Sequence, residues 1–115
     1  MFRFEELQIW RLAVDYGKDC YRLSATFPKH EIYSLCDQLR RAGLSVSNNI
    51  AEGSVGSSAN FKKYLSIAIG SVLETVNLVN FAMEIDYATR KDCDLMYTKA
   101  EILIKKIRAF SNSLS

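Results

Sequence analysis

The side chains that could do chemistry are few in this chain and are not spaced for catalysis. His30 is the only histidine, and it lies in a turn beside Pro28, which favours a surface or capping role over general-base work. A Ser-His-Asp or Cys-His arrangement would depend on this one residue. Glu74 is the only charged residue between Tyr64 and Met83, so paired-carboxylate and di-metal chemistry lack their ligands. The sequence predicts no enzyme, no metal site and no cofactor.

The cysteines and the loops add no site. Cys20, Cys36 and Cys93 lack any Cys-x-x-Cys spacing, so neither a disulfide framework nor a zinc site is indicated. Their apolar neighbours favour small buried side chains over reactive thiols. The loop over residues 53–58 has no Gly-Lys-Ser and does not resemble a phosphate-binding loop. Residues 1–10 carry charges where a signal peptide is apolar, so we expect a cytoplasmic protein.

Basic residues give the one binding signal. The 15 Lys and Arg exceed the 13 Asp and Glu by two, which permits an anionic partner without requiring one. Several cations lie near the two chain ends, which an antiparallel bundle would bring together. The candidate phosphate contacts are Arg3, Arg11, Lys99, Lys105, Lys106 and Arg108. The alternative is that cations in a last helical turn only favour the helix dipole and that Glu101 and Lys105 form an ordinary pair.

The elements that must position these residues are helices. With 115 residues, 49% of them hydrophobic, 5 Gly and one Pro, the chain suits a single helical domain over 1–115. Apolar residues recur at steps of three and four, without a competing strand pattern. The predicted helices cover 5–26, 31–53, 59–87 and 90–112, and short loops make the expected fold an all-α, antiparallel, up-down-up-down four-helix bundle.

Local signals set the expected helix ends. The residue before Pro28 should leave the helical region, which ends the first helix. Gly53 is expected to stop the second helix in the manner of a C-terminal glycine. Ser57 or Ser58 is the expected N-cap of the third helix, and Thr89 that of the fourth.

The third predicted helix is apolar on two sides. Ile67, Gly70, Leu78 and Phe81 lie off its core seam. This helix is long enough to span a membrane, but Glu74 and several hydroxyl and amide residues argue against a membrane span. An apolar face beyond the core stripe indicates self-association, with Ile67, Leu78 and Phe81 at the interface. The alternative is a wider core stripe.

The second predicted helix has an amide-rich polar face, which alternatively is only a solvated surface. Glu52 opposes the helix dipole in the last turn and should therefore have a partner. We expect five residues to be structural polar contacts. Among them, the carboxylates of Glu52 and Glu74 should each bind an arginine or a backbone donor from another helix or subunit. The five residues are Arg41, Asn49, Glu52, Ser71 and Glu74.

Three motifs in the middle of the chain occur together. Gln38 and Arg41 belong to Gln-Leu-Arg-Arg-Ala, Asn49, Glu52 and Gly53 to Asn-Ile-Ala-Glu-Gly, and Gly70, Ser71 and Glu74 to a Gly-Ser-x-x-Glu pattern. With these separations the chain resembles the four helix bundle proteins, also called 23S ribosomal RNA intervening-sequence proteins. The similarity covers nearly the whole chain.

The resemblance implies a non-enzymatic bundle that assembles into a ring-like homopentamer. The chain is also similar to the accessory variability protein of diversity-generating retroelements, a pentamer that binds nucleic acid through a basic surface. Two departures bear on nucleic-acid binding, since Val55-Gly56 and Ile69 stand where members of the family often carry cations. Two functions are therefore expected: an oligomeric accessory protein that binds RNA or DNA, or a scaffold whose partner is another protein.

Overall fold

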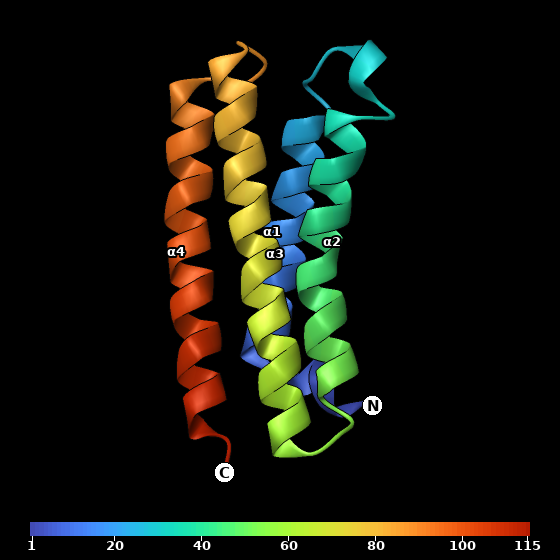
Figure 1. Ribbon diagram of the computed structural model, residues 1–115, viewed down its shortest axis with the longest axis vertical. Helices are drawn as coiled ribbons and strands as arrows, with labels where there is room; N and C mark the ends of the chain where they lie inside the picture. The colour runs from blue at the N-terminus through green and yellow to red at the C-terminus, as the bar shows by residue number, and fades with distance from the viewer.

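Four α-helices make up almost the whole chain in the computed structural model, which describes residues 1–115. They are α1 (Gln8–Ser24), α2 (Leu35–Gly53), α3 (Ser58–Glu84) and α4 (Arg90–Ser113), with 3-10 turns η1 (Arg3–Glu6) and η2 (Lys29–Glu31) before α1 and α2. Figure 1 shows that consecutive helices run in opposite directions and that both chain ends lie at the same end of the bundle. Helix α1 packs against α2 and α4, and α3 packs against the same two. The predicted all-α four-helix bundle is confirmed.

The core follows the predicted apolar stripes. Phe61, Leu39, Ile50, Leu65 and Ile107 are among the largest fully buried side chains. The three cysteines are free and buried, as expected for small apolar side chains. Burial raises the pKa of the Cys20 thiol to about 12, so this thiol stays protonated near neutral pH.

Three helix ends differ from the predicted ones by three residues or more, because turns and not the apolar stripes determine where they lie. Helix α1 begins at Gln8 after an extended Leu7, so the preceding residues form the separate turn η1. Helix α2 begins at Leu35, because Ser34 has a non-helical backbone (φ −127°, ψ −97°). Helix α3 ends at Glu84, before Asp86 takes a positive φ of 64°. Hydrophobic periodicity does not register single backbone angles of this kind.

The two predicted N-caps are confirmed. The Ser57 hydroxyl accepts a hydrogen bond from the backbone N–H of Asn60 at 3.1 Å. The Thr89 hydroxyl accepts one from the backbone N–H of Asp92 at 3.1 Å, and Asp92 accepts from Thr89 N–H in return. Each cap satisfies a donor that the first helical turn leaves free.

Gly53 has a different role from the predicted one. No glycine in the chain has a positive φ, and Gly53 is the last residue inside α2. A Cβ at this position would lie 2.6 Å from Cβ of Tyr64 and 2.9 Å from Cδ1 of Phe61. Gly53 is therefore needed for the close approach of α3 to the end of α2.

We expect Gly53→Ala to lower the free energy of unfolding by about 1–3 kcal/mol, because the added methyl group overpacks this contact. Urea unfolding followed by circular dichroism measures the loss. Gly56→Ala is the matched control, since its Cβ would come closest to the end of the flexible Asn60 side chain at 2.8 Å. Equal stability of Gly53→Ala and the parent protein would contradict the close-packing role.

Helix α3 buries a wider stripe than its predicted seam. Leu78 is only 8% exposed and belongs to the core, so its assignment to an intermolecular interface is wrong. The reason is that α3 contacts both α2 and α4. Ile67 and Phe81 are 44% and 57% exposed, and Leu73, absent from the predicted interface, is 53% exposed.

By length and composition alone, α3 also passes as a membrane-spanning helix. Its most apolar window has a mean hydropathy of 1.5, and 39% of that window is buried inside the bundle. The core helix of a soluble bundle meets the same criteria, so this is weak evidence for a membrane.

Candidate nucleic-acid interface

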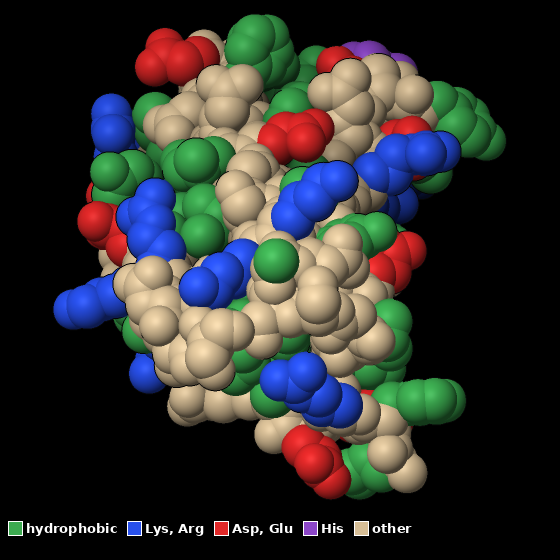
Figure 2. All heavy atoms as spheres, turned by 60° about the horizontal axis from the view of Figure 1, so that its bottom comes forward, with side chains coloured by type: hydrophobic (Ala, Val, Ile, Leu, Met, Phe, Trp, Pro, Cys, Tyr) green, Lys and Arg blue, Asp and Glu red, His purple; other side chains and the backbone are tan.

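Exposed cations gather at the end of the bundle that holds both chain ends. This end holds the start of α1, the start of α3 and the last turns of α4 (Figure 1). We call the following exposed residues the basic end: Arg11, Lys62, Lys63, Lys105, Lys106 and Arg108. None of them forms an ion pair within the chain, and Lys105 is not paired with Glu101. Figure 2, in which this end comes forward, shows several Lys and Arg side chains on the surface.

A groove between α3 and α4 brings two of these cations together. Lys62 and Arg108 line a hollow of about 350 Å³. Its other polar walls are Ser66, Ser111 and Asn112, whose hydroxyl and amide groups can donate hydrogen bonds. Paired cations beside neutral donors suit a phosphate group.

Sequence reasoning missed Lys62 and Ser66. They lie more than 40 positions before Arg108 and Ser111, so only the packing of α3 against α4 reveals the groove. One signal was available. Lys62 and Lys63 stand near the N-terminus of α3, where a cation gains nothing from the helix dipole.

One acidic residue, Glu101, lies beside this surface and lines a neighbouring hollow with Lys105 and Arg108. The others lie elsewhere on this end. Glu5 and Glu6 belong to η1, which packs against α1 and α2, and Glu52 lies in the last turn of α2. The α3/α4 groove has no acidic residue in its lining. A phosphate there would not meet a carboxylate wall.

Two of the predicted phosphate contacts are engaged within the chain. The Lys99 ammonium lies 2.8 Å from Oδ2 of Asp19, about two helical turns away from the last turns of α4. The Arg3 guanidinium donates to the Ser54 carbonyl at 3.3 Å and lies 5.2 Å from the centre of the Phe61 ring. The structure therefore brings Arg11, Lys105, Lys106 and Arg108 to the basic end and does not place Lys99 there.

The motif residue Ser71 joins α3 to Ser45 of α2, and the motif residue Asn49 contacts the same serine within α2. The Ser45 and Ser71 hydroxyls are 2.9 Å apart and share a hydrogen bond. Asn49 donates from Nδ2 to the Ser45 carbonyl at 2.8 Å and to its hydroxyl at 2.9 Å. Arg41 donates to Asp37 at 2.8 Å along α2 itself. Gln38 is exposed on the same helix.

The carboxylates of Glu52 and Glu74 are exposed and have no hydrogen-bond or ion-pair partner within the chain. The prediction that an arginine or a backbone donor from another helix of the same chain binds these carboxylates is therefore wrong. Both side chains reach solvent, so their charge has no desolvation cost in a single chain. Any partner of the Glu52 and Glu74 carboxylates must therefore come from another subunit.

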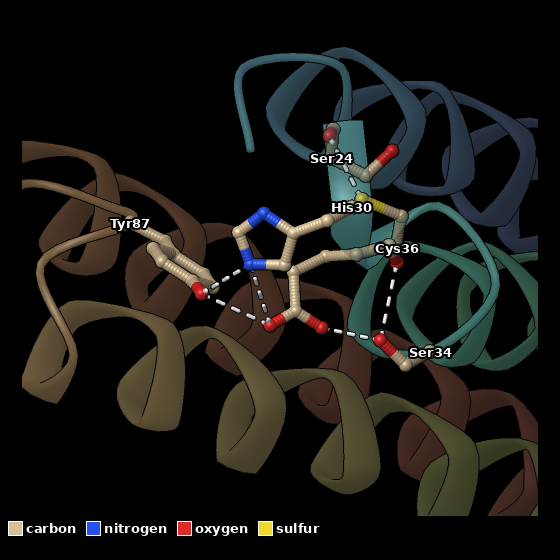
Figure 3. Close-up of polar contacts among 6 residues, drawn as sticks. Ser24, His30, Ser34, Cys36 and Tyr87 are labelled. Atoms are coloured by element: carbon tan, nitrogen blue, oxygen red, sulfur yellow. Dashed lines mark hydrogen bonds and ion pairs between the residues drawn. The ribbon is translucent and has the colours of Figure 1, made fainter. Parts of the chain in front are cut away.

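The single histidine lies in a polar cluster (Figure 3), in the α1–α2 connection at the opposite end of the bundle (Figure 1). Tyr87 donates to Oε2 of Glu31 at 3.0 Å and lies 3.3 Å from Nε2 of His30. The Ser34 hydroxyl donates to the other Glu31 oxygen. These contacts tie the α1–α2 connection to the turn after α3. No nucleophile stands beside the imidazole to make a catalytic pair.

We expect Tyr87→Phe to destabilise the fold more at about pH 7 than at about pH 3. Hydrogen bonds from Ser34, and next from Tyr87, lower the pKa of Glu31. A carboxyl pKa below its unfolded value of about 4.3 contributes stability above that value and loses it as the pH falls through the lowered pKa. Urea unfolding of both proteins at the two pH values measures the difference. A stability gap that is the same at both would contradict the role of Tyr87.

These observations define a class of protein, a helical bundle whose most distinctive surface is a basic end. No group of three or more His, Cys, Asp or Glu side chains could hold a metal ion. Residues 5–109 match the family described as 23S rRNA-intervening sequence protein, and the chain belongs to this family. No curated protein matches the chain.

Proposed function

We propose that this protein is a non-enzymatic, homo-oligomeric accessory protein that binds RNA or DNA through phosphate contacts. The observation that carries the proposal is the α3/α4 groove, whose lining combines Lys62 and Arg108 with neutral donors and contains no acidic residue. Lys105 and Lys106, exposed and unpaired on α4, add two further cations to this end of the bundle. The family name adds support, since it refers to an intervening sequence of 23S rRNA.

Self-association is the second part of the proposal. Ile67, Leu73 and Phe81 leave large apolar surfaces of α3 in solvent, and such surfaces commonly mark contacts between molecules. The resemblance implies a pentamer, in which five copies of net charge +2 would together carry +10. A ring multiplies weak contacts, because one strand can touch several subunits at once.

Binding should be weak per subunit and independent of sequence. Cations on helix surfaces contact phosphates, which carry no sequence information. The test is an anisotropy titration of labelled single-stranded RNA and DNA, each in two unrelated sequences, at low salt. Similar affinities for the two sequences are expected. No binding of any of the four probes would overturn the proposal.

A protein-binding scaffold is the second candidate. The observation that favours it is the polar face of α2, where the side chains of Gln38, Asn48 and Glu52 are exposed. In that case the oligomer forms, but the four titrations show no binding and charge changes at the basic end have no effect.

A further inference from the structure

Helix α3 carries a second stripe of residues on its solvent side. These residues follow one another at steps of three and four, and all are exposed; we call them the outer seam: Ile67, Gly70, Glu74, Asn77 and Phe81. Glycine inside a helix costs about 0.5–1 kcal/mol relative to alanine. A Cβ on Gly70 would meet nothing within 4 Å, so packing within the chain does not require glycine there. Close approach by another molecule would explain it.

A matching groove of about 690 Å³ runs along the outside of α1 and α2. On its floor these helices come close to each other, since a Cβ on Gly17 would lie 3.2 Å from the Gly43 carbonyl oxygen. Its apolar lining includes Trp10, Val14, Leu44 and Ala51. Lys18 also lines the groove, is exposed, and forms no ion pair within the chain.

Glu74 and Lys18 stand at the same height along the bundle. The Ser45–Ser71 hydrogen bond places these two residues at the same height on α2 and α3. The close approach of Gly17 to Gly43 does the same for α1 and α2. At a rise of about 1.5 Å per residue, Glu74 is about 4.5 Å beyond Ser71. Gly43 is two residues above Ser45 and Lys18 is one residue above Gly17, which gives about 4.5 Å again.

We propose that the outer seam of one copy lies in the α1/α2 groove of the next copy, where Glu74 faces Lys18. The inference rests on the proposed self-association and names the two surfaces that make it. Rotation about an axis parallel to the helices leaves every height unchanged, so the unpaired carboxylate meets the unpaired ammonium. Gly70 lets the backbone of α3 come close to the groove.

The contact is head-to-tail. The outer seam belongs to α3 and the groove to α1 and α2, so neither surface meets a second copy of itself. Heterologous contacts of this kind generate rings when the rotation closes and do not give two-fold dimers. Each subunit would bind the outer seam of one neighbour in its α1/α2 groove and place its own outer seam in the groove of another.

Charge exchange tests the pairing. By light scattering at micromolar concentration, the parent protein should have the mass of a closed ring. Glu74→Lys and Lys18→Glu should each raise the dissociation constant by at least about tenfold. The double variant, with both charges exchanged, should recover most of the association. Glu101→Lys, on an exposed and unpaired carboxylate of α4, is the matched control and should keep the parent mass.

A cysteine pair tests the geometry directly. Lys18→Cys with Glu74→Cys should give covalent oligomers on oxidation, whereas each single variant should give none, because the native cysteines are buried. Absence of cross-linking in the double variant would overturn the proposed contact, as would an oligomer indifferent to both charge reversals.

The outcomes separate this contact from the proposed function. A ring that ignores these changes leaves self-association standing and removes only this interface, whereas a monomeric parent protein removes both. Loss of RNA binding in Lys18→Glu with an unchanged mass would mean that nucleic acid occupies the groove, and it would also overturn the contact.

Discussion

Replacing both Lys62 and Arg108 with glutamate is expected to weaken the binding of single-stranded RNA by at least about tenfold. The two side chains line one groove, so a phosphate held there loses both of its cations. The reversal also adds two negative charges, which repel the neighbouring phosphates. An anisotropy titration at low salt measures the change.

The control is a double variant with the same change of charge at the opposite end. Lys29 in η2 and Lys91 at the start of α4 are exposed and unpaired. If Lys29→Glu with Lys91→Glu weakens binding as much as the groove variant, net charge and not the basic end governs affinity. That result would contradict the assignment of the site.

Phe61→Ala is expected to cost about 3–5 kcal/mol of the free energy of unfolding. Phe61 is 1% exposed, packs edge-on against Phe110 with ring centres 5.5 Å apart, and lies under the Arg3 guanidinium. A domain of this size has about 5–15 kcal/mol in total, so the variant should unfold at much lower urea concentration. Tyr33→Ala, at a side chain that is 92% exposed, is the control and should change the midpoint little. A loss below about 1 kcal/mol in Phe61→Ala would contradict the central place of this ring.

Local patterns predicted the fold, because steps of three and four along the chain translate directly into the buried face of a helix. The caps at Ser57 and Thr89 were equally local, since each contact spans three residues. Predictions failed where backbone angles or neighbouring helices decide. The non-helical backbone of Ser34 prevents α2 from beginning before Leu35. Leu78 is buried because α3 packs against both α2 and α4.

The candidate site was predicted only in part. Lys105, Lys106 and Arg108 could be found because they are neighbours in sequence and the bundle topology places them beside the start of α1. Lys62 could not, because the α3/α4 groove depends on which faces of the two helices meet. The pairing of Lys99 with Asp19 is equally a product of packing, since 80 positions separate the two residues.

The measurement that tests phosphate binding by the basic end most directly is the salt dependence of RNA affinity for the parent protein. Each phosphate neutralised on a single strand lowers log affinity by roughly 0.7 per unit of log salt. One phosphate held by Lys62 and Arg108 contributes about −0.7 to the slope, and one further phosphate on each of Lys105 and Lys106 brings the expected slope to about −2.1. A flat dependence, or no binding at low salt, would contradict a phosphate-binding role.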